Sequence, residues 1–173
     1  MAIVSLGLTI VIWLWPAPRT KFTRAEQERM TSLLKKAPQP HEPIQLGCPD
    51  TDDDACLVAG QLVNVFTGAG WDVLGDKVAP VRLGKPAPGI TIMRRAEGTG
   101  CTIEDTDPED DWAPEPGSKG RCFRETPSVR AIRAAFASVE VRARRRGDVG
   151  GALPEGVLGV FVGPRLFDRQ LKE

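Results

Sequence analysis

An amphipathic helix between two apolar segments constrains the fold more than any other feature. Apolar side chains recur at three- and four-residue spacing from Ala55 to Ala69, which predicts a helix with one broad buried face. The aspartates at 52–54 can cap its start, and glycines at its end supply the stop. Short strands are expected at 44–47 and 71–74. Since such a unit cannot bury its apolar face alone, later strands must complete a sheet.

Three further strands and a second helix are predicted downstream. An edge strand is expected at 81–83, a buried or half-buried strand at 90–94 and a last strand at 157–162. Thr126-Pro127 predicts a helix start, with threonine as the cap and proline at the first helical position. The arginines at 142–146 are interpreted as solvated cations at the end of this helix, where they complement its dipole.

This order of elements predicts an α/β fold. We expect a small, mostly parallel sheet of order 2-1-3-4, half of a flavodoxin-like sheet, with helices on both faces and a hydrophobic helix before it. A ferredoxin-like α+β fold is the alternative. The expected organisation is a membrane anchor (1–18), an amphipathic stalk helix with a Pro-rich linker (19–43), the α/β domain (44–165) and a tail (166–173).

The first residues form an apolar run from Ala2 to Trp15. As a helix it would span about 21 Å, less than the roughly 30 Å hydrocarbon core of a bilayer. A membrane anchor, a signal peptide and a buried helix are the three alternatives. We favour the anchor, because the run is apolar all round and Trp13 and Trp15 suit the interface. Basic residues from Arg19 to Arg29 follow, so the positive-inside rule favours a single-pass inner-membrane protein with its domain in the cytoplasm rather than the periplasm.

The chain has four cysteines, which allow three pairings. A bridge between Cys101 and Cys122 would close a long acidic loop and imply a non-cytoplasmic compartment; free thiols in a reducing cytoplasm are the alternative. Cys48 or Cys56, near a helix N-terminus, could have a depressed pKa, but no base accompanies them. The single histidine, His41, lies in the linker and is interpreted as solvated. The cysteine spacings match no common zinc site.

Composition and motifs argue against several function classes. Lys+Arg and Asp+Glu are both 23, so net charge does not favour nucleic acid. The sequence contains no G-x-S-x-G motif and no glycine-rich phosphate loop. We therefore predict that the protein is not an enzyme, with no catalytic residues, no cofactor, no metal and no nucleic-acid partner.

The candidate ligand-binding residues are four aspartates after the first strand. In the predicted sheet a ligand would lie at the carboxyl ends of strands one and three, between this turn and residues 95–100. A magnesium pocket would use Asp50 and Asp52, whereas helix capping explains the aspartates more simply. The acidic part of the loop at 96–125 is interpreted as solvated, with a weak divalent-cation site as the alternative. The candidate residues are Asp50, Asp52, Asp53 and Asp54.

Short motifs are similar to those of a loose group of bacterial membrane-anchored small α/β domains of uncharacterised function. The group shares an N-terminal transmembrane helix, a strand, an acidic cap, a helix ending in A-G-W and a final strand closing in G-P. The resemblance implies a membrane-tethered, non-enzymatic module and lends no catalytic residue. The matching residues are Asp54-Ala55, Ala69-Gly70-Trp71, Gly89-Ile90 and Val162-Gly163-Pro164.

These observations together favour a membrane-anchored, non-catalytic sensor or protein-interaction domain. Its partners would be the lipid bilayer and another membrane or membrane-proximal protein. A domain that binds a small ligand or divalent cation at the sheet's switch point is one alternative. A structural subunit of a membrane complex is the other.

Overall fold

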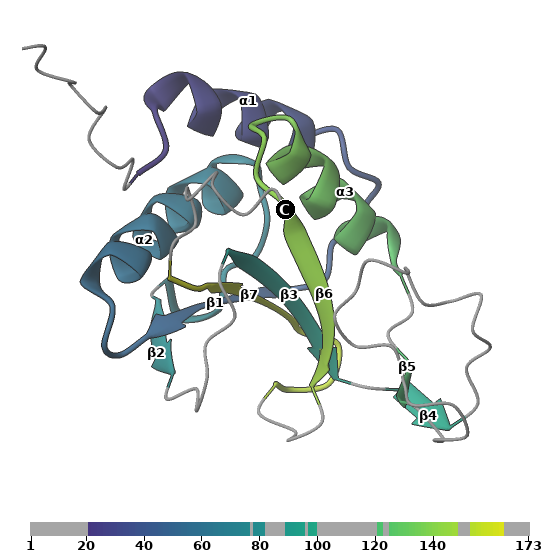
Figure 1. The fold of residues 1–173 in the computed structure, drawn as a ribbon. Coiled ribbons are helices and arrows are strands. Elements are labelled where there is room, and N and C mark those ends of the chain that lie inside the picture. Colours follow the sequence, from purple (N-terminus) through teal and green to yellow (C-terminus); the bar gives the residue numbers. More distant parts are fainter. Residues whose placement is uncertain are drawn as a thin grey trace, which may run out of the picture.

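The computed structural model describes residues 21–76, 78–81, 89–95, 97–99, 121–122, 125–148 and 153–164. Figure 1 shows the α-helices gathered on one side of a twisted sheet. The helices are α1 (Arg24–Leu34), α2 (Asp53–Gly68) and α3 (Pro127–Ala137). The sheet strands are β1 (Ile44–Pro49), β2 (Ala79–Val81), β3 (Ile90–Arg95), β6 (Ala143–Asp148) and β7 (Leu158–Val162). A second, two-stranded sheet pairs β4 (Glu97–Thr99) with β5 (Arg121–Cys122).

The small α/β fold is confirmed, but the predicted strand order is wrong. The order is β2-β1-β7-β3-β6. β7 runs parallel to β1 and antiparallel to β3, so the sheet is mixed. All five residues of β7 are buried, and a strand buried on both faces needs a neighbour at each edge. The uninterrupted apolar run at 157–162 was therefore the signal for a central strand.

The predicted helices on both faces are also wrong, for a topological reason. β1–α2–β2 and β3–α3–β6 are two parallel crossover units on opposite sides of β7. The strands of one unit are antiparallel to the strands of the other, and the two crossovers lead toward opposite edges of the sheet. When both crossovers are right-handed, this arrangement puts both helices on the same face. Figure 1 shows this arrangement, with α2 over β1 and α3 over β6.

Three local predictions need correction. Segment 71–74 is not a full strand: Val73 makes one isolated parallel bridge to Ile44, and a short 3-10 helix (Leu74–Asp76) follows. The strand beside β1 is instead β2, which overlaps the predicted edge strand at a single residue. The arginines at 142–146 do not end a helix, because α3 stops at Ala137 and β6 begins at Ala143. Alternation along β6 points Ala143 and Arg145 toward the helices.

α1 belongs to the core of the domain. Phe22, Met30 and Leu34 are each 1% exposed and lie in the same apolar cluster as the sheet. α1 packs against both α2 and α3, and the Phe22 and Phe136 rings lie 6.4 Å apart. A capping box is present at its start, where Glu26 N donates to Thr23 Oγ1 and Thr23 N donates to the Glu26 carboxylate.

The other face of the sheet carries a glycine–aromatic contact. Phe161 alternates with Val160 and Val162, which face the helices, so its ring lies on the opposite face. Gly47 is its direct partner on β1. A Cβ at Gly47 would lie 2.5 Å from the Phe161 ring, and one at Gly159 would lie 2.6 Å from it. The ring therefore occupies the space that two side chains would need.

Several predictions lie outside the described residues, including the anchor at 1–18, most of the acidic loop and the tail at 166–173. Within the described part of the chain, no helix is both long and apolar enough to cross a membrane.

Candidate functional site

The four candidate aspartates lie at the turn between β1 and α2. Asp52 is the cap of α2: its Oδ1 accepts a hydrogen bond from Ala55 N at 2.9 Å. Asp53 and Asp54 form the first turn of the helix, where carboxylates meet the positive end of its dipole. Asp50, Asp53 and Asp54 are exposed, and so is Leu57, with 55% of its surface accessible. We call Asp50, Asp53, Asp54 and Leu57 the acidic corner.

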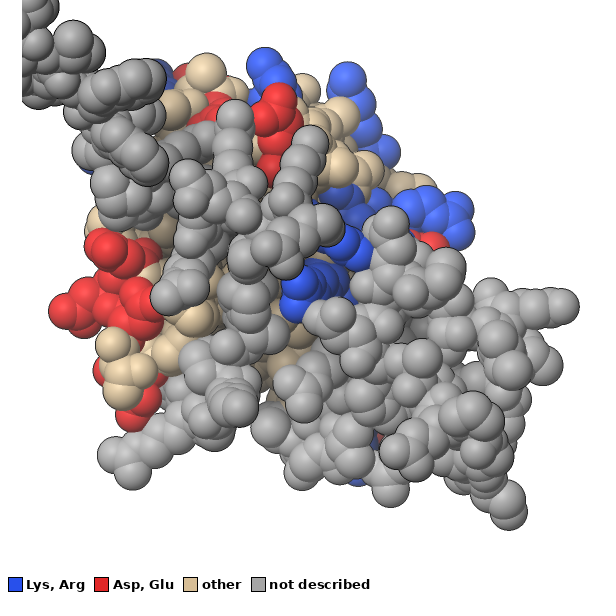
Figure 2. All heavy atoms as spheres, in the orientation of Figure 1, with Lys and Arg blue, Asp and Glu red and all other residues tan. Residues whose placement is uncertain are grey.

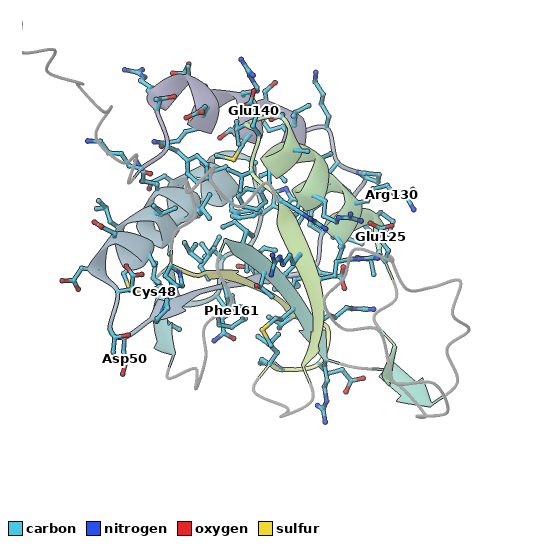
Figure 3. The ribbon with its side chains drawn as sticks, in the orientation of Figure 1. Cys48, Asp50, Glu125, Arg130, Glu140 and Phe161 are labelled. Atoms are coloured by element: carbon cyan, nitrogen blue, oxygen red, sulfur yellow. A yellow bond between two sulfur atoms is a disulfide. The ribbon has the colours of Figure 1, made fainter. Side chains whose placement is uncertain are left out.

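Charged side chains are unevenly placed on the face drawn in Figure 2. Acidic side chains gather over the start of α2, apart from the basic side chains over α3 and β6. Figure 3 shows Asp50 projecting outward from the corner.

A disulfide between Cys48 and Cys56 ties the corner together. It joins the end of β1 to the first turns of α2 across 5.1 Å between the Cα atoms. Cys48 is 1% exposed and lies among the apolar core residues. The two cysteines considered for a reactive thiol are therefore bonded to each other. The predicted bridge between Cys101 and Cys122 lies outside the described side chains.

The predicted crevice between strands one and three does not form. β1 and β3 flank β7 and run in opposite directions, so their carboxyl ends lie at opposite ends of the sheet. The aspartate turn and the residues after β3 are therefore separated. Among the residues that the structure describes, no three His, Cys, Asp or Glu side chains converge as a metal site would require.

A second polar constellation joins the linker, β3 and α3, and sequence reasoning missed it. Glu42 Oε1 lies 3.0 Å from Arg94 Nε, and Glu42 Oε2 accepts a hydrogen bond from Thr126 Oγ1 at 2.6 Å. Their side chains are well covered, with 16% of Arg94 and 19% of Glu42 exposed. Thr126 is also the cap of α3: its Oγ1 accepts a hydrogen bond from Val129 N while it donates to Glu42. The constellation therefore fixes the position of the helix start.

Glu125 extends this constellation toward β6. It lies 3.0 Å from Arg133 and 4.0 Å from Arg145, whose side chain is only 7% exposed. Figure 3 shows Glu125 just before the start of α3. Alternation along β3 was the available signal, since Arg94 shares the face of Ile90 and Ile92. No sequence pattern indicated the partners, because Glu42 and Glu125 are far away in the chain.

His41 is not a solvated linker residue. Its ring stacks on Trp71, with centroids 4.1 Å apart and planes 10° apart. Its Nε2 lies 3.3 Å from the carbonyl of Ala37. Trp71 in turn donates from Nε1 to the carbonyl of Leu34 at 3.2 Å. The stack holds the linker between α1 and β1 against the end of α2.

Comparison of the chain with protein-family models, with curated proteins and with solved structures finds no match.

Proposed function

We propose that this protein is a membrane-tethered, non-catalytic interaction domain that contacts its partner through the acidic corner. The observation that carries the proposal is Leu57, a large apolar side chain that is 55% exposed beside the exposed carboxylates of Asp53 and Asp54. An apolar anchor inside a polar rim is the usual composition of a protein contact surface. The tether is the predicted anchor at residues 1–18.

Rigidity supports the acidic corner as a contact surface. The Cys48–Cys56 disulfide and the Asp52 cap hold the turn and the start of α2 in one arrangement. A surface that is already ordered loses little conformational entropy when it binds, so more of the contact energy appears as affinity.

The charges of the acidic corner define the chemistry of the partner. It would present an apolar pocket for Leu57 with lysine or arginine side chains around it. Opposite charge accelerates encounter and suppresses wrong partners, and both effects weaken as salt rises. A membrane or membrane-proximal protein with such a pocket would meet the tethered domain at high effective concentration.

The disulfide favours a compartment different from the one that the charge rule indicates. Stable disulfides form in oxidising environments and are rare in the bacterial cytoplasm. The basic residues after the apolar run favour a cytoplasmic domain, but the positive-inside rule is a statistical bias, whereas a disulfide needs an oxidant. We therefore propose that the domain lies on the periplasmic side of the inner membrane.

Site-specific photo-crosslinking tests the proposed surface. A photoreactive amino acid at position 57 of the full chain should trap one partner in cells, which can then be purified. Leu57→Ser should weaken binding to that partner by about tenfold, because the anchor of the interface is lost. Leu74→Ser is the matched control, since Leu74 is 36% exposed and lies outside the acidic corner. Equal affinity of the Leu57→Ser and wild-type chains would refute the proposal.

A further inference from the structure

α1 is the described helix that follows the apolar run most closely. Eight residues, 16–23, separate Trp15 from Arg24, the first residue of α1. The chain from Trp15 to Arg24 spans at most about 32 Å, even when fully extended. With the run in the bilayer, α1 must therefore begin within this distance of the end of the run. This inference thus rests on the tether of the proposed function.

A polar groove runs along the outward side of α1. Its volume is about 510 Å³, and Val65 of α2 forms its other wall. The apolar side of α1 is buried in the domain, so the groove side is the one left to face outward. Two cations, two hydroxyls and an amide line it, together with one carboxylate: Arg24, Lys35, Thr31, Ser32, Gln27 and Glu28.

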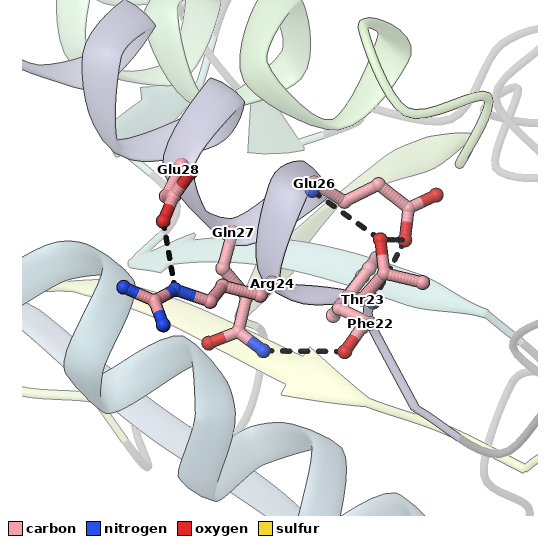
Figure 4. Close-up of polar contacts among 6 residues, drawn as sticks. All are labelled: Phe22, Thr23, Arg24, Glu26, Gln27 and Glu28. Atoms are coloured by element: carbon pink, nitrogen blue, oxygen red, sulfur yellow. Dashed lines mark hydrogen bonds and ion pairs between the residues drawn. The ribbon is translucent and has the colours of Figure 1, made fainter.

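The two cations are available for an anionic ligand. Arg24 pairs with Glu28 at 2.9 Å, but these side chains are 92% and 66% exposed, and such a surface pair exchanges easily with another anion. Lys35 is exposed at the C-cap of α1. Figure 4 shows that Gln27 donates to the carbonyl of Phe22 and that Glu26 is held by Thr23, so neither blocks Arg24.

The charge of the whole segment favours an anionic surface. Residues 21–36 contain five basic and two acidic side chains. Figure 2 shows basic side chains along the upper rim of the molecule, where Figure 1 places α1, with acidic side chains between them. Basic residues next to a membrane are attracted to anionic lipids over about a Debye length, roughly 10 Å.

We propose that the groove along α1 binds the phosphate headgroups of anionic phospholipids and holds this face of the domain against the bilayer. Arg24 and Lys35 contact the phosphate oxygens. The acidic corner, at the opposite end of α2 from the linker, then remains accessible to a protein partner.

Lipids with a spin-labelled headgroup test this orientation. The full chain is reconstituted into bilayer discs of phosphatidylcholine, with or without about 30% phosphatidylglycerol, and amide signals are recorded by NMR. Broadening at Gln27–Lys35 should be about threefold stronger in the anionic discs than in the neutral discs. The double variant Arg24→Gln/Lys35→Gln should lose this difference. Arg130→Gln, an exposed arginine on α3, is the matched control and should keep it.

Flotation with vesicles separates the two proposals. A chain that floats with vesicles of both compositions but shows equal broadening in both discs keeps its tether and refutes the lipid groove. Retention of the anionic effect by the double variant also refutes it. A chain that floats with neither vesicle refutes the tether and, with it, the groove.

Discussion

The ring of Phe161 leaves no room for a side chain at two other positions of the sheet, and both are glycine. The ring, on the face of the sheet away from the helices, covers Gly47 on β1 and Gly159 on its own strand. Leu153, 2% exposed, packs beside it. These contacts give the second face of the sheet a small apolar layer without a helix.

Gly47→Ala should destabilise the domain by about 1–3 kcal/mol, because a methyl group 2.5 Å from the Phe161 ring forces the ring or the strand to move. Urea unfolding of the purified chain measures the change. Gly60→Ala is the control: nothing lies within 4 Å of its Cβ position in α2, so it should be neutral or stabilise by about 0.5–1 kcal/mol. Equal unfolding midpoints for the two variants would contradict the clash.

Asp52 illustrates a candidate ligand whose side chain serves the backbone. Asp52→Ala should cost about 1 kcal/mol of stability, because Ala55 N loses its acceptor at the start of α2. Asp53→Asn, which removes only a charge near the helix dipole, should cost a few tenths of that amount. The stability difference between the two variants should be the same with and without magnesium. A difference that grows with magnesium would instead indicate a cation site.

At the scale of elements, the Glu42 constellation joins three segments that are distant in the chain. Glu42→Gln removes the charge that faces Arg94 in a place where only 16% of the arginine is exposed. We expect a loss of about 1–3 kcal/mol, because a partly buried cation loses the carboxylate that lies 3.0 Å from it.

Glu28→Gln is the matched control for Glu42→Gln. It breaks the Arg24–Glu28 pair, whose side chains are 92% and 66% exposed, and should cost less than about 0.5 kcal/mol. Both variants are compared by urea unfolding. Similar losses would mean that Glu42 adds no more to stability than a surface pair does.

Local signals predicted the helices well and β6 poorly. The caps at Asp52 and Thr126 form as expected, because capping depends on residues a few positions apart. β6 was missed because Arg144 and Arg145 suggest a charged helix end, whereas β-strand formation depends on pairing with β3. The acidic corner was predictable as a turn, but the exposure of Leu57 was not, since it depends on how α2 packs.

At the scale of the molecule, the Cys48–Cys56 disulfide links the fold to its compartment. Its short loop of separation 8 corresponds to about 2.5 kcal/mol in the chain-entropy description. A reductant should therefore lower the free energy of unfolding of the wild-type chain by about this amount, and should leave the Cys48→Ala/Cys56→Ala variant unchanged. In cells, thiol trapping should find this pair oxidised. A fully reduced pair would contradict the periplasmic proposal.

The strand order could not be derived from element order alone. Short connections and right-handed crossovers limit the choices, but they allow the last strand to lie at an edge or at the centre. Whether the last strand lies at an edge or at the centre depends on how completely Leu158–Val162 is buried. The apolar sequence of this strand indicated complete burial, but the assumption of a mostly parallel sheet placed the strand at an edge.

The central position of β7 also has a consequence for biogenesis. Within the sheet, β7 (Leu158–Val162) is the strand that joins the β1–α2–β2 unit to the β3–α3–β6 unit, so β1 and β3 lack their inner neighbour while that segment is still being synthesised. We therefore expect the sheet to be completed only after the last strand has emerged. For the periplasmic location that we propose, this means that the domain would complete its fold and form its disulfide after the chain has crossed the membrane.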